Sequence, residues 1–346
     1  MKALILAAMG NMPKKPNFFI VGAPKCGTTA LDQYLGKHPD IFMARKEMHF
    51  FGSDLKFGPQ FYRRSHKSYM AEFESCKDQT FIGESSVWYL FSRYAADEIK
   101  AFNPDARIII MLRNPVSMLH ALFCAFRADG NENLPTFEKA LAAENERQMG
   151  LYIGRQAYLP QALVYHAAAR YTEQVQRYFG VFGRDRVHVI IFDDFRTDTE
   201  GVYRKTLEFL GAAPQGPAPA FDPVNANVNG NESVRSSFVR AILNDPLVRG
   251  TAITLRAWLP RSAFSLVQNV GLRLNALNFI NSREKRSPLA KELEQSLRRD
   301  FAPEVERLSA LLRRDLTHWC SPDGKSTAWR EPEALESDSS RIGASV

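Results

Sequence analysis

Short apolar runs alternate with helix-like patterns through the first two thirds of the chain. Four continuous apolar runs predict β-strands that are buried on both faces, at 18–21, 81–84, 107–112 and 187–192. Apolar residues at helical spacing predict helices at 30–35, 94–102, 116–127, 161–179 and 200–210. Buried strands that alternate with helices are typical of a parallel sheet with helices on both faces. The pattern therefore predicts a three-layer α/β/α fold with a central parallel sheet.

The last third of the chain has a different pattern. A stretch rich in Pro, Ala and Gly at 212–223 predicts a surface connection, and helical spacing returns at 234–243 and 289–312. Beyond residue 320 the chain is polar and acidic, which favours a flexible tail. We therefore expect an N-terminal extension, a single domain that includes a helical C-terminal extension, and a tail, at 1–16, 17–320 and 321–346.

Composition and charge narrow the possible partners. The 346 residues are 45% apolar and 24% charged, which excludes a disordered or low-complexity chain. Lys and Arg number 45 against 38 Asp and Glu, and the net charge of +7 favours an anionic partner such as a phosphorylated cofactor, an acidic glycan or a membrane surface. The sequence has no run of five or six like charges, so we expect no nucleic-acid partner.

The cysteines and the start of the chain bear on location. Cys26, Cys76, Cys124 and Cys320 lie far apart, which favours neither a zinc site nor a disulfide framework and indicates a reducing compartment. The apolar stretch after Met1 is short and leads directly into the first strand, so a signal peptide is not expected. No sequence stretch reaches the roughly 18 apolar residues of a membrane helix. We therefore expect a cytoplasmic protein without a transmembrane segment.

The junction after the first strand carries the clearest chemistry. The run Gly22-Ala23-Pro24-Lys25-Cys26-Gly27-Thr28-Thr29 joins a buried strand to a helix start, where backbone N–H groups and the helix dipole attract anions. Its glycine spacing is similar to a Walker A loop, G-x-x-x-x-G-K-S/T, but Thr28 stands where that motif has lysine. We therefore predict a phosphate site that does not use the lysine and Mg²⁺ chemistry of a nucleoside triphosphatase, and expect no metal.

The run Pro24-Lys25-Cys26-Gly27-Thr28-Thr29-Ala30-Leu31 resembles the 5′-phosphosulfate loop of the sulfotransferases that use 3′-phosphoadenosine 5′-phosphosulfate (PAPS). In that family the lysine stabilises the leaving phosphate, while backbone amides and threonines hold the 5′-phosphate. The resemblance implies a P-loop-like fold, a catalytic Lys25, PAPS as sulfuryl donor and 3′,5′-adenosine bisphosphate as product. It also implies a set of cofactor-binding residues: Lys25, Cys26, Gly27, Thr28, Thr29 and Ala30.

A second motif follows the third predicted strand, in the run Leu112-Arg113-Asn114-Pro115-Val116-Ser117. An arginine at the end of a parallel strand and a serine in the next helical turn can bind one phosphate together. The 3′-phosphate motif of the same family has this form, so the resemblance implies that Arg113 and Ser117 bind the 3′-phosphate. Arg235 lies where the family has a late cofactor loop, although the Lys/Gly-rich form of that loop in animal enzymes is absent here.

The acceptor side is predicted from Arg45-Lys46-Glu47-Met48-His49-Phe50-Phe51. Alternation along an extended segment would place Glu47 and His49 on one side. The run resembles the K-E-x-H-F-F segment of heparan-type sulfotransferases and related bacterial enzymes, in which the glutamate is the catalytic base. The resemblance implies that Glu47 is the base, with Lys46 and His49 as supporting catalytic residues. A surface Lys–Glu pair beside a core histidine is the structural alternative, and His66 is a weaker candidate base.

The run Gly83-Glu84-Ser85-Ser86-Val87-Trp88-Tyr89-Leu90 resembles the family segment G-E-x-S/T-x-x-Y, which lines the acceptor cleft. Animal heparan enzymes commonly carry Lys where this chain has Ser85, so the resemblance does not extend to a polyanionic acceptor. Trp88 and Tyr89 are either sugar-stacking aromatics or core residues. Tyr158 and Tyr165 flank a helix start where the family often presents residues to the acceptor.

These motifs together predict a sulfotransferase that moves the sulfuryl group of PAPS to a hydroxyl or amine. We expect a carbohydrate-type or small-molecule acceptor, and the choice stays open between a glycan, a glycolipid and another small molecule. One alternative is a nucleotide or sugar kinase of P-loop fold, in which Asp193 and Asp194 at a strand end would bind Mg²⁺. The other alternative is a non-catalytic relative that retains the cofactor site.

Overall fold

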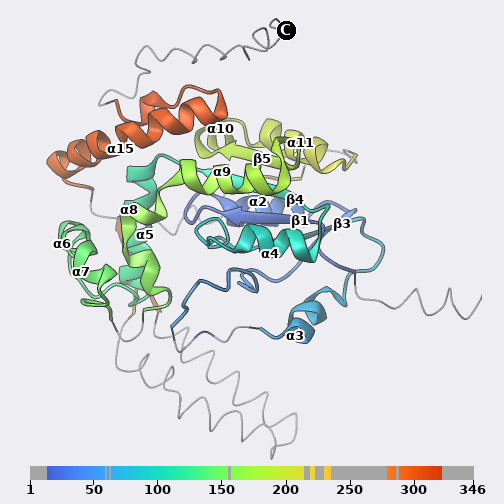
Figure 1. Ribbon diagram of the computed structural model, residues 1–346, viewed down its shortest axis with the longest axis horizontal. Helices are drawn as coiled ribbons and strands as arrows, with labels where there is room; N and C mark the ends of the chain where they lie inside the picture. Colours follow the sequence, from blue (N-terminus) through green and yellow to red (C-terminus); the bar gives the residue numbers. More distant parts are fainter. Residues whose placement is uncertain are drawn as a thin grey trace, which may run out of the picture. The chain divides into compact units, whose positions relative to one another are not determined.

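The computed structural model describes residues 14–58, 61, 64–154, 157–213, 219–222, 230–234, 279–285 and 288–321 (Figure 1). Arg235, most of the predicted helix at 234–243 and nearly all of the predicted tail lie outside the described residues. The chain divides into two compact units, Met1–Ala290 and Lys291–Val346. The single domain expected at 17–320 stays a prediction.

A five-stranded parallel sheet forms the centre of the first unit. Its strands are β1 (Phe18–Gly22), β2 (Ile41–Met43), β3 (Phe81–Ser85), β4 (Arg107–Leu112) and β5 (Val187–Ile191), in the order β2-β3-β1-β4-β5. Phe18 of β1 is in register with Gly83 on one side and with Arg107 on the other. The four strands predicted from apolar runs are confirmed. The additional strand, β2, has only three residues and is too short to give an apolar run.

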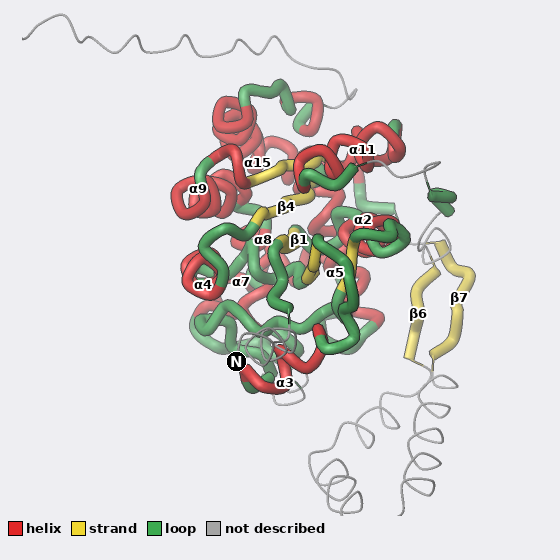
Figure 2. The backbone as a smooth tube through the Cα atoms, turned by 90° about the vertical axis from the view of Figure 1, so that its right-hand side faces the viewer, coloured by secondary structure: helices red, strands yellow, loops and turns green. Residues whose placement is uncertain are grey.

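Helices cover both faces of this sheet. The longer ones are α2 (Thr28–Leu35), α4 (Ala95–Phe102), α5 (Pro115–Ala128), α9 (Tyr171–Phe182) and α11 (Thr199–Leu210). The connections from β1 to β2 and from β3 to β4 run in opposite directions across the sheet, so right-handed crossovers put α2 and α4 on opposite faces. Figure 2 shows α4 and α9 on one side of the strands, and α2 and α11 on the other. The predicted three-layer α/β/α fold is confirmed.

One predicted helix is interrupted. The segment expected to be helical at 161–179 consists of the 3₁₀ turn η2 (Pro160–Leu163), α8 (Tyr165–Ala168) and α9. The backbone leaves helical geometry at Val164, with ψ 84°, and at Arg170, with ψ 64°. Single-residue breaks of this kind leave the apolar spacing nearly unchanged, so the pattern alone predicts one continuous helix.

Shorter elements complete the first unit. The helices are α3 (His66–Met70), α6 (Phe137–Ala142), α7 (Glu144–Gln148) and α10 (Phe192–Thr197), with 3₁₀ turns η1 (Ala71–Phe73) and η3 (Arg184–Arg186). The strands β6 (Gly230–Val234) and β7 (Phe279–Lys285) form a separate antiparallel pair. Val234 was expected to begin a helix, and it ends β6 instead.

The second unit contains α15 (Lys291–Leu312) and the 3₁₀ turn η4 (Thr317–Trp319). The helix predicted at 289–312 is thereby confirmed. Arg298 ties the helix to the end of the unit, because its Nη1 donates to the carbonyl oxygens of Trp319 at 2.8 Å and Ser321 at 2.9 Å. Among the helices that the structure describes, none combines the length and the apolar character needed to cross a membrane.

Candidate functional site

The loop between β1 and α2 forms a backbone cradle at the carboxyl edge of the sheet. Gly27 is the N-cap of α2 with φ 91°, and Lys25 also has a left-handed φ of 61°. A Cβ at Gly27 would lie 3.1 Å from the ring of Phe192, so a side chain there would crowd that ring. Within the described residues no side chain caps the helix, which leaves its N-terminus suited to an external anion.

The loop residues differ in what they expose. The Lys25 side chain is exposed, whereas Cys26 is fully buried and its Sγ lies 3.4 Å from the carbonyl oxygen of Pro24. Burial raises the pKa of the Cys26 thiol to about 12. Cys26 can therefore contact a phosphate only through its backbone, while Lys25 can reach it with its ammonium group.

The two phosphate motifs meet at this edge because β1 and β4 are adjacent parallel strands. The amide of Ala23 donates to the carbonyl oxygen of Met111 at 2.7 Å. Arg113 Nη1 donates to the carbonyl oxygen of Lys25 at 3.4 Å, across 88 positions of sequence. The Arg113 guanidinium also lies 4.8 Å from the centre of the Phe192 ring, which is the ring that a Cβ at Gly27 would meet.

The motif that contains Arg113 is also a helix start. Asn114 is the N-cap of α5, and its Oδ1 accepts the amide of Ser117 at 3.2 Å. Pro115 occupies the first helical turn, where its missing N–H costs nothing. Asn114 and Pro115 therefore shape the turn, while Arg113 is half-buried and Ser117 is exposed.

The predicted acceptor segment lies beside the phosphate loop. Lys46 Nζ donates to Thr28 Oγ1, in the first turn of α2, at 2.9 Å. Glu47 Oε2 lies 2.8 Å from His49 Nε2, and the side chains are 27% and 1% exposed respectively. His49 is thus a buried histidine, as the structural alternative required, but it is paired with the candidate base. Lys46 is bonded to the loop and is not a free surface charge.

The electrostatics of this cluster favour an ionised Glu47. Burial alone would raise the pKa of Glu47, but hydrogen bonding and charge from His49, together with Lys46 and the backbone of Val87, hold it below its usual value. Burial lowers the pKa of Lys46, and the neighbouring carboxylates of Glu47 and Asp32 oppose that change. Lys46 therefore lies close to negatively charged carboxylates at a site that is partly shielded from solvent.

Asp32 is a site residue that the motifs did not identify. Burial raises its pKa to about 6, Lys46 lowers it and Glu47 raises it. Asp32 follows Thr28 by four positions on α2, so both lie on the same helix face. That spacing was visible in the sequence and is the signal that would have found it.

The segment expected to line the acceptor cleft is mostly buried. Glu84, Ser85 and Ser86 have no exposed area, and Trp88 is 3% exposed and packs on Phe91 and Phe126. Tyr89 has no exposed area and its hydroxyl accepts hydrogen bonds from the backbone. Trp88 and Tyr89 are therefore core aromatics and are not available to stack on a sugar.

Three other aromatic rings surround His49 and are partly exposed. The ring centres of Phe57, Phe61 and Tyr158 lie 5.1, 5.9 and 6.0 Å from that of His49. Tyr158 is close enough to Glu47 for the negative charge to add to the effect of burial in raising its pKa. We call Phe57, Phe61 and Tyr158 the aromatic wall.

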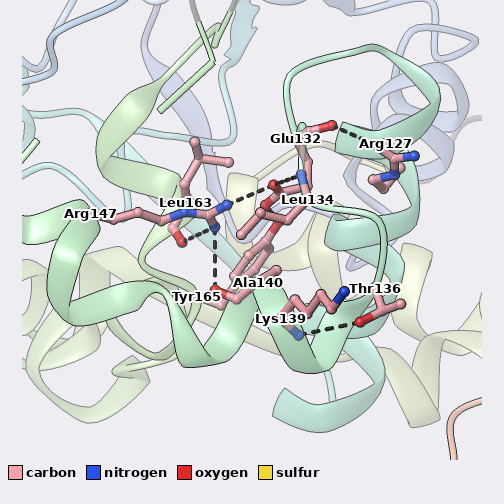
Figure 3. A network of polar contacts seen from close by, with 9 residues as sticks. All are labelled: Arg127, Glu132, Leu134, Thr136, Lys139, Ala140, Arg147, Leu163 and Tyr165. Atoms are coloured by element: carbon pink, nitrogen blue, oxygen red, sulfur yellow. Dashed lines mark hydrogen bonds and ion pairs between the residues drawn. The ribbon is translucent and has the colours of Figure 1, made fainter. Parts of the chain in front are cut away.

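Tyr165, the other tyrosine considered for the acceptor, is buried in a separate polar network. Its hydroxyl donates to Glu132 Oε2 at 2.9 Å, and Arg147 Nη2 donates to Glu132 Oε1 at 2.6 Å (Figure 3). Arg127 Nη1 donates to the carbonyl oxygen of Glu132 at 3.1 Å. Tyr165 is therefore a structural residue.

The remaining candidate residues, a histidine and two aspartates, lie on α3 and α10. His66 begins α3 and is exposed, with its ring 6.2 Å from that of Phe50, and no described contact joins it to Glu47. Asp193 and Asp194 lie in the first turn of α10. In the part of the chain that the structure describes, no three His, Cys, Asp or Glu side chains are grouped to hold a metal ion.

Comparison with known proteins gives a family match. Residues 15–222 match the family model described as "Sulfotransferase domain". A sulfotransferase of known structure from Alicyclobacillus acidocaldarius is 31% identical, with a TM-score of 0.62, and the match covers 89% of this chain and 100% of that one.

Curated relatives are similar over shorter stretches. The membrane-associated sulfotransferase kil1 of Dictyostelium discoideum is 35% identical over 108 residues, which are 31% of this chain and 22% of the relative. Carbohydrate sulfotransferase 15 of Homo sapiens is 25% identical over 252 residues, covering 58% and 44%. Heparan sulfate glucosamine 3-O-sulfotransferase 6 of Homo sapiens is 32% identical over 118 residues, covering 33% and 31%. The chain spans less than half the length of these relatives.

Proposed function

This chain belongs to the sulfotransferase family, and we propose that it transfers the sulfuryl group of PAPS to a hydroxyl or amine of an acceptor. The observation that carries the proposal is the contact of Arg113 with the loop of Lys25, which brings two phosphate-binding motifs together. The hydrogen bond from Lys46 to Thr28 adds the segment of Glu47 to the same place. Donor-binding groups and a proton acceptor therefore share one edge of the sheet.

The residues present fit a donor with phosphate groups at two ends. The uncapped start of α2, the positive φ of Gly27 and the exposed Lys25 suit one anionic group. Arg113 and Ser117, at the start of α5, suit a second. In this proposal Lys25 and the backbone from Cys26 to Ala30, with the hydroxyls of Thr28 and Thr29, hold the 5′-phosphosulfate, and Arg113 and Ser117 hold the 3′-phosphate. Arg235, outside the described residues, is proposed to add to the 3′-phosphate site.

The mechanism follows from the charges of the site. When bound, PAPS supplies the sulfuryl group, which passes to the acceptor atom as its bond to the phosphate breaks. Glu47 is ionised at neutral pH because its pKa lies below its usual value, so it can accept the acceptor's proton. His49 keeps the carboxylate in place. Lys25 places positive charge where negative charge develops on the leaving side.

A carbohydrate-type acceptor is part of the proposal. The aromatic wall beside His49 offers partly exposed rings on which the apolar face of a sugar could pack. Ser85 is buried, so it does not present a side chain to the acceptor. The named carbohydrate and heparan sulfate sulfotransferases among the relatives support this acceptor class. We also propose a cytoplasmic location, based on four widely separated cysteines that form no disulfide with one another in the described residues.

The test is calorimetric binding of 3′,5′-adenosine bisphosphate, compared with ADP and Mg²⁺. We expect the bisphosphate to bind without metal and Arg113→Ala to weaken it by about 10- to 100-fold, since a charge-assisted hydrogen bond contributes about 1.5–3 kcal/mol. Arg204→Ala is the matched control, because Arg204 pairs with Glu200 on the exposed face of α11. A preference for ADP with Mg²⁺ would reject the sulfotransferase mechanism in favour of a kinase.

A further inference from the structure

Six successive amides next to Glu47 donate to side chains instead of to a backbone ladder. The residues from 44 to 51 form neither helix nor strand. Three side chains bind these amides in pairs: Ser86 Oγ accepts from Met48 and His49, both at 3.0 Å; the Tyr89 hydroxyl accepts from Phe50 at 2.8 Å and Phe51 at 3.3 Å; the Glu98 carboxylate accepts from Gly52 at 2.6 Å and Ser53 at 3.1 Å. Side chains from the loop after β3 therefore hold the part of the segment next to Glu47, and Glu98 of α4 holds only its far end.

Glu84 fixes the direction of the Ser86 hydroxyl and lies near that of Tyr89. Ser86 Oγ donates to Glu84 Oε1 at 2.5 Å, and burial together with the Glu84 charge raises the pKa of Tyr89. A hydroxyl has one donor and two acceptor positions. With the Ser86 hydrogen directed at Glu84, both of its acceptor positions face the amides of Met48 and His49. Tyr69 donates to Glu84 Oε2 at 3.4 Å, which completes the surroundings of the carboxyl group.

We propose that Glu84, Ser86 and Tyr89 are positioning residues, which hold the segment of Glu47 and His49 so that the two side chains stay paired beside the phosphate loop. This inference rests on the proposed role of Glu47 as base. The argument is geometric: Ser86 binds the amide of His49 itself, and the amide next to it belongs to the residue that follows Glu47. A displacement of these amides would also displace Glu47 and His49, whose side-chain atoms Oε2 and Nε2 are 2.8 Å apart.

Burial supports a role that depends on geometry. Glu84, Ser86 and Tyr89 have no exposed area, and burying a carboxyl group is unfavourable unless its hydrogen bonds are made. Burial raises the pKa of Glu84 to about 7, and the hydroxyls of Ser86, Tyr89 and Tyr69 oppose that rise. Two charged groups interact with Glu84: the charge of Glu47 raises the pKa of Glu84, and the charge of Glu84 raises the pKa of Lys46.

The activity test compares two variants that each disturb one pair of amides. For Ser86→Ala we expect kcat to fall about 10- to 100-fold, because a small displacement of reacting groups has this effect. The dissociation constant of 3′,5′-adenosine bisphosphate and the acceptor KM should stay within about threefold. Glu98→Gln is the matched control, since Glu98 binds Gly52 and Ser53 at the far end of the same segment. We expect it to keep the wild-type kcat. Ser86→Thr keeps the hydroxyl and should recover most of the activity.

Amide hydrogen exchange tests the contacts without any assay of transfer. In Ser86→Ala the amides of Met48 and His49 should exchange faster, while those of Gly52 and Ser53 keep their protection. Tyr89→Phe provides a second variant if Ser86→Ala does not fold, and it should expose the amides of Phe50 and Phe51. Unchanged exchange in both folded variants would overturn the contacts.

The outcomes separate this inference from the proposed function. A wild-type protein that binds no bisphosphate and transfers no sulfuryl group would reject the proposed function, whatever the exchange shows. An active wild type with undiminished kcat in Ser86→Ala would overturn the positioning role alone. Equal losses of kcat in Ser86→Ala and Glu98→Gln would also overturn it, because a general loosening of the segment would then explain both. A loss confined to Ser86→Ala, with rescue by Ser86→Thr, supports it.

Discussion

Glu47 and Glu132 each lie within hydrogen-bond distance of a basic side chain, yet their surroundings differ completely. Glu132 and Arg147 have no exposed side-chain area, and their atoms Oε1 and Nη2 are 2.6 Å apart. The Glu132 carboxylate also accepts from the Tyr165 hydroxyl at 2.9 Å and from the amide of Leu134 at 2.8 Å (Figure 3). Glu47 is 27% exposed, and the side chain that it meets at hydrogen-bond distance is the buried His49.

The two carboxylates differ in exposure and in whether they can still accept a hydrogen bond or proton from a bound molecule. The hydrogen-bonding capacity of Glu132 is used inside the protein, and no solvent or substrate reaches it. Glu47 keeps an exposed fraction, a lowered pKa and a neighbouring lysine that is bonded to the phosphate loop. Removing one partner of a buried, saturated ion pair destabilises a fold, whereas a partly exposed pair can exchange a proton with a bound molecule.

The largest expected effect comes from removing the charge of Glu47. Glu47→Gln should lower kcat by about 10³-fold, within the range of general-base catalysis, and leave bisphosphate binding intact. Steady-state kinetics and calorimetry on one preparation measure both quantities. Transfer at the wild-type rate would show that another group accepts the proton.

The corresponding change at the buried pair of Glu132 and Arg147 should lower the stability of the fold. Arg147→Met removes one partner of a fully buried ion pair and leaves the Glu132 carboxylate uncompensated, which costs about 3–5 kcal/mol of unfolding free energy. Urea unfolding followed by circular dichroism measures the loss. The fraction that remains folded should keep its kcat, since this network does not touch Glu47 through any described contact. A loss of kcat in the folded protein would erase the contrast between the two clusters.

Glu84 lies between these two cases, because it is fully buried and yet acts on the segment of Glu47. Its pKa is raised to about 7 from its usual 4.5, so the folded protein binds this proton more tightly than the unfolded chain. The resulting stability is fully present below pH 4.5 and is lost as the pH rises to about 7. From a difference of about 2.5 pKa units, we expect Glu84→Gln to remove about 3 kcal/mol of this pH dependence.

The measurement is urea unfolding of both proteins at about pH 5 and about pH 8, on either side of the raised pKa. The wild type should lose stability relative to Glu84→Gln between these values, because the variant has no proton to release. Any loss of hydrogen bonding in the variant is common to both pH values and cancels in the comparison. A constant difference at both pH values would contradict the raised pKa.

The sheet, and the edge at which Arg113 meets the loop of Lys25, were predictable from sequence because their signals are local. Apolar runs predict the strands, and strand order then brings the ends of β1 and β4 together, so Arg113 reaches the loop of Lys25. The details that were wrong include the breaks at Val164 and Arg170, and Phe192, which was expected to end a strand and begins α10. In each case one residue changes backbone conformation inside an apolar stretch.

The support of the acceptor segment was not predictable because it depends on pairs of distant residues. Ser86 contacts the amides of Met48 and His49 across 38 and 37 positions. A local pattern marks the serine and the segment separately but cannot show that one binds the other. The motif around Glu84 was expected to line the acceptor cleft. Its residues Glu84, Ser86 and Tyr89 are instead fully buried, and the hydroxyls of Ser86 and Tyr89 accept hydrogen bonds from the backbone of the segment.

The smallest effect that we predict concerns the charges of Lys46, Glu47 and Asp32. Asp32 and Glu47 both raise the pKa of Lys46, which burial lowers. Asp32→Asn removes one of these carboxylates, so the ammonium of Lys46 loses its proton more easily and the alkaline limb of the kcat profile should move to lower pH. At neutral pH, kcat should fall about two- to fivefold, the effect of a weak, partly exposed charge interaction. A pH–rate profile of wild type and variant measures both.

The matched background for this comparison is Lys46→Arg, because a guanidinium stays protonated throughout the accessible pH range. In that background, adding Asp32→Asn should leave the alkaline limb where it is, since the group that loses its proton in the wild type has been replaced. A shift of the limb that persists when Asp32→Asn is combined with Lys46→Arg would assign it to a group other than Lys46. The alkaline limb of the kcat profile would then report a group other than Lys46, Glu47 and Asp32.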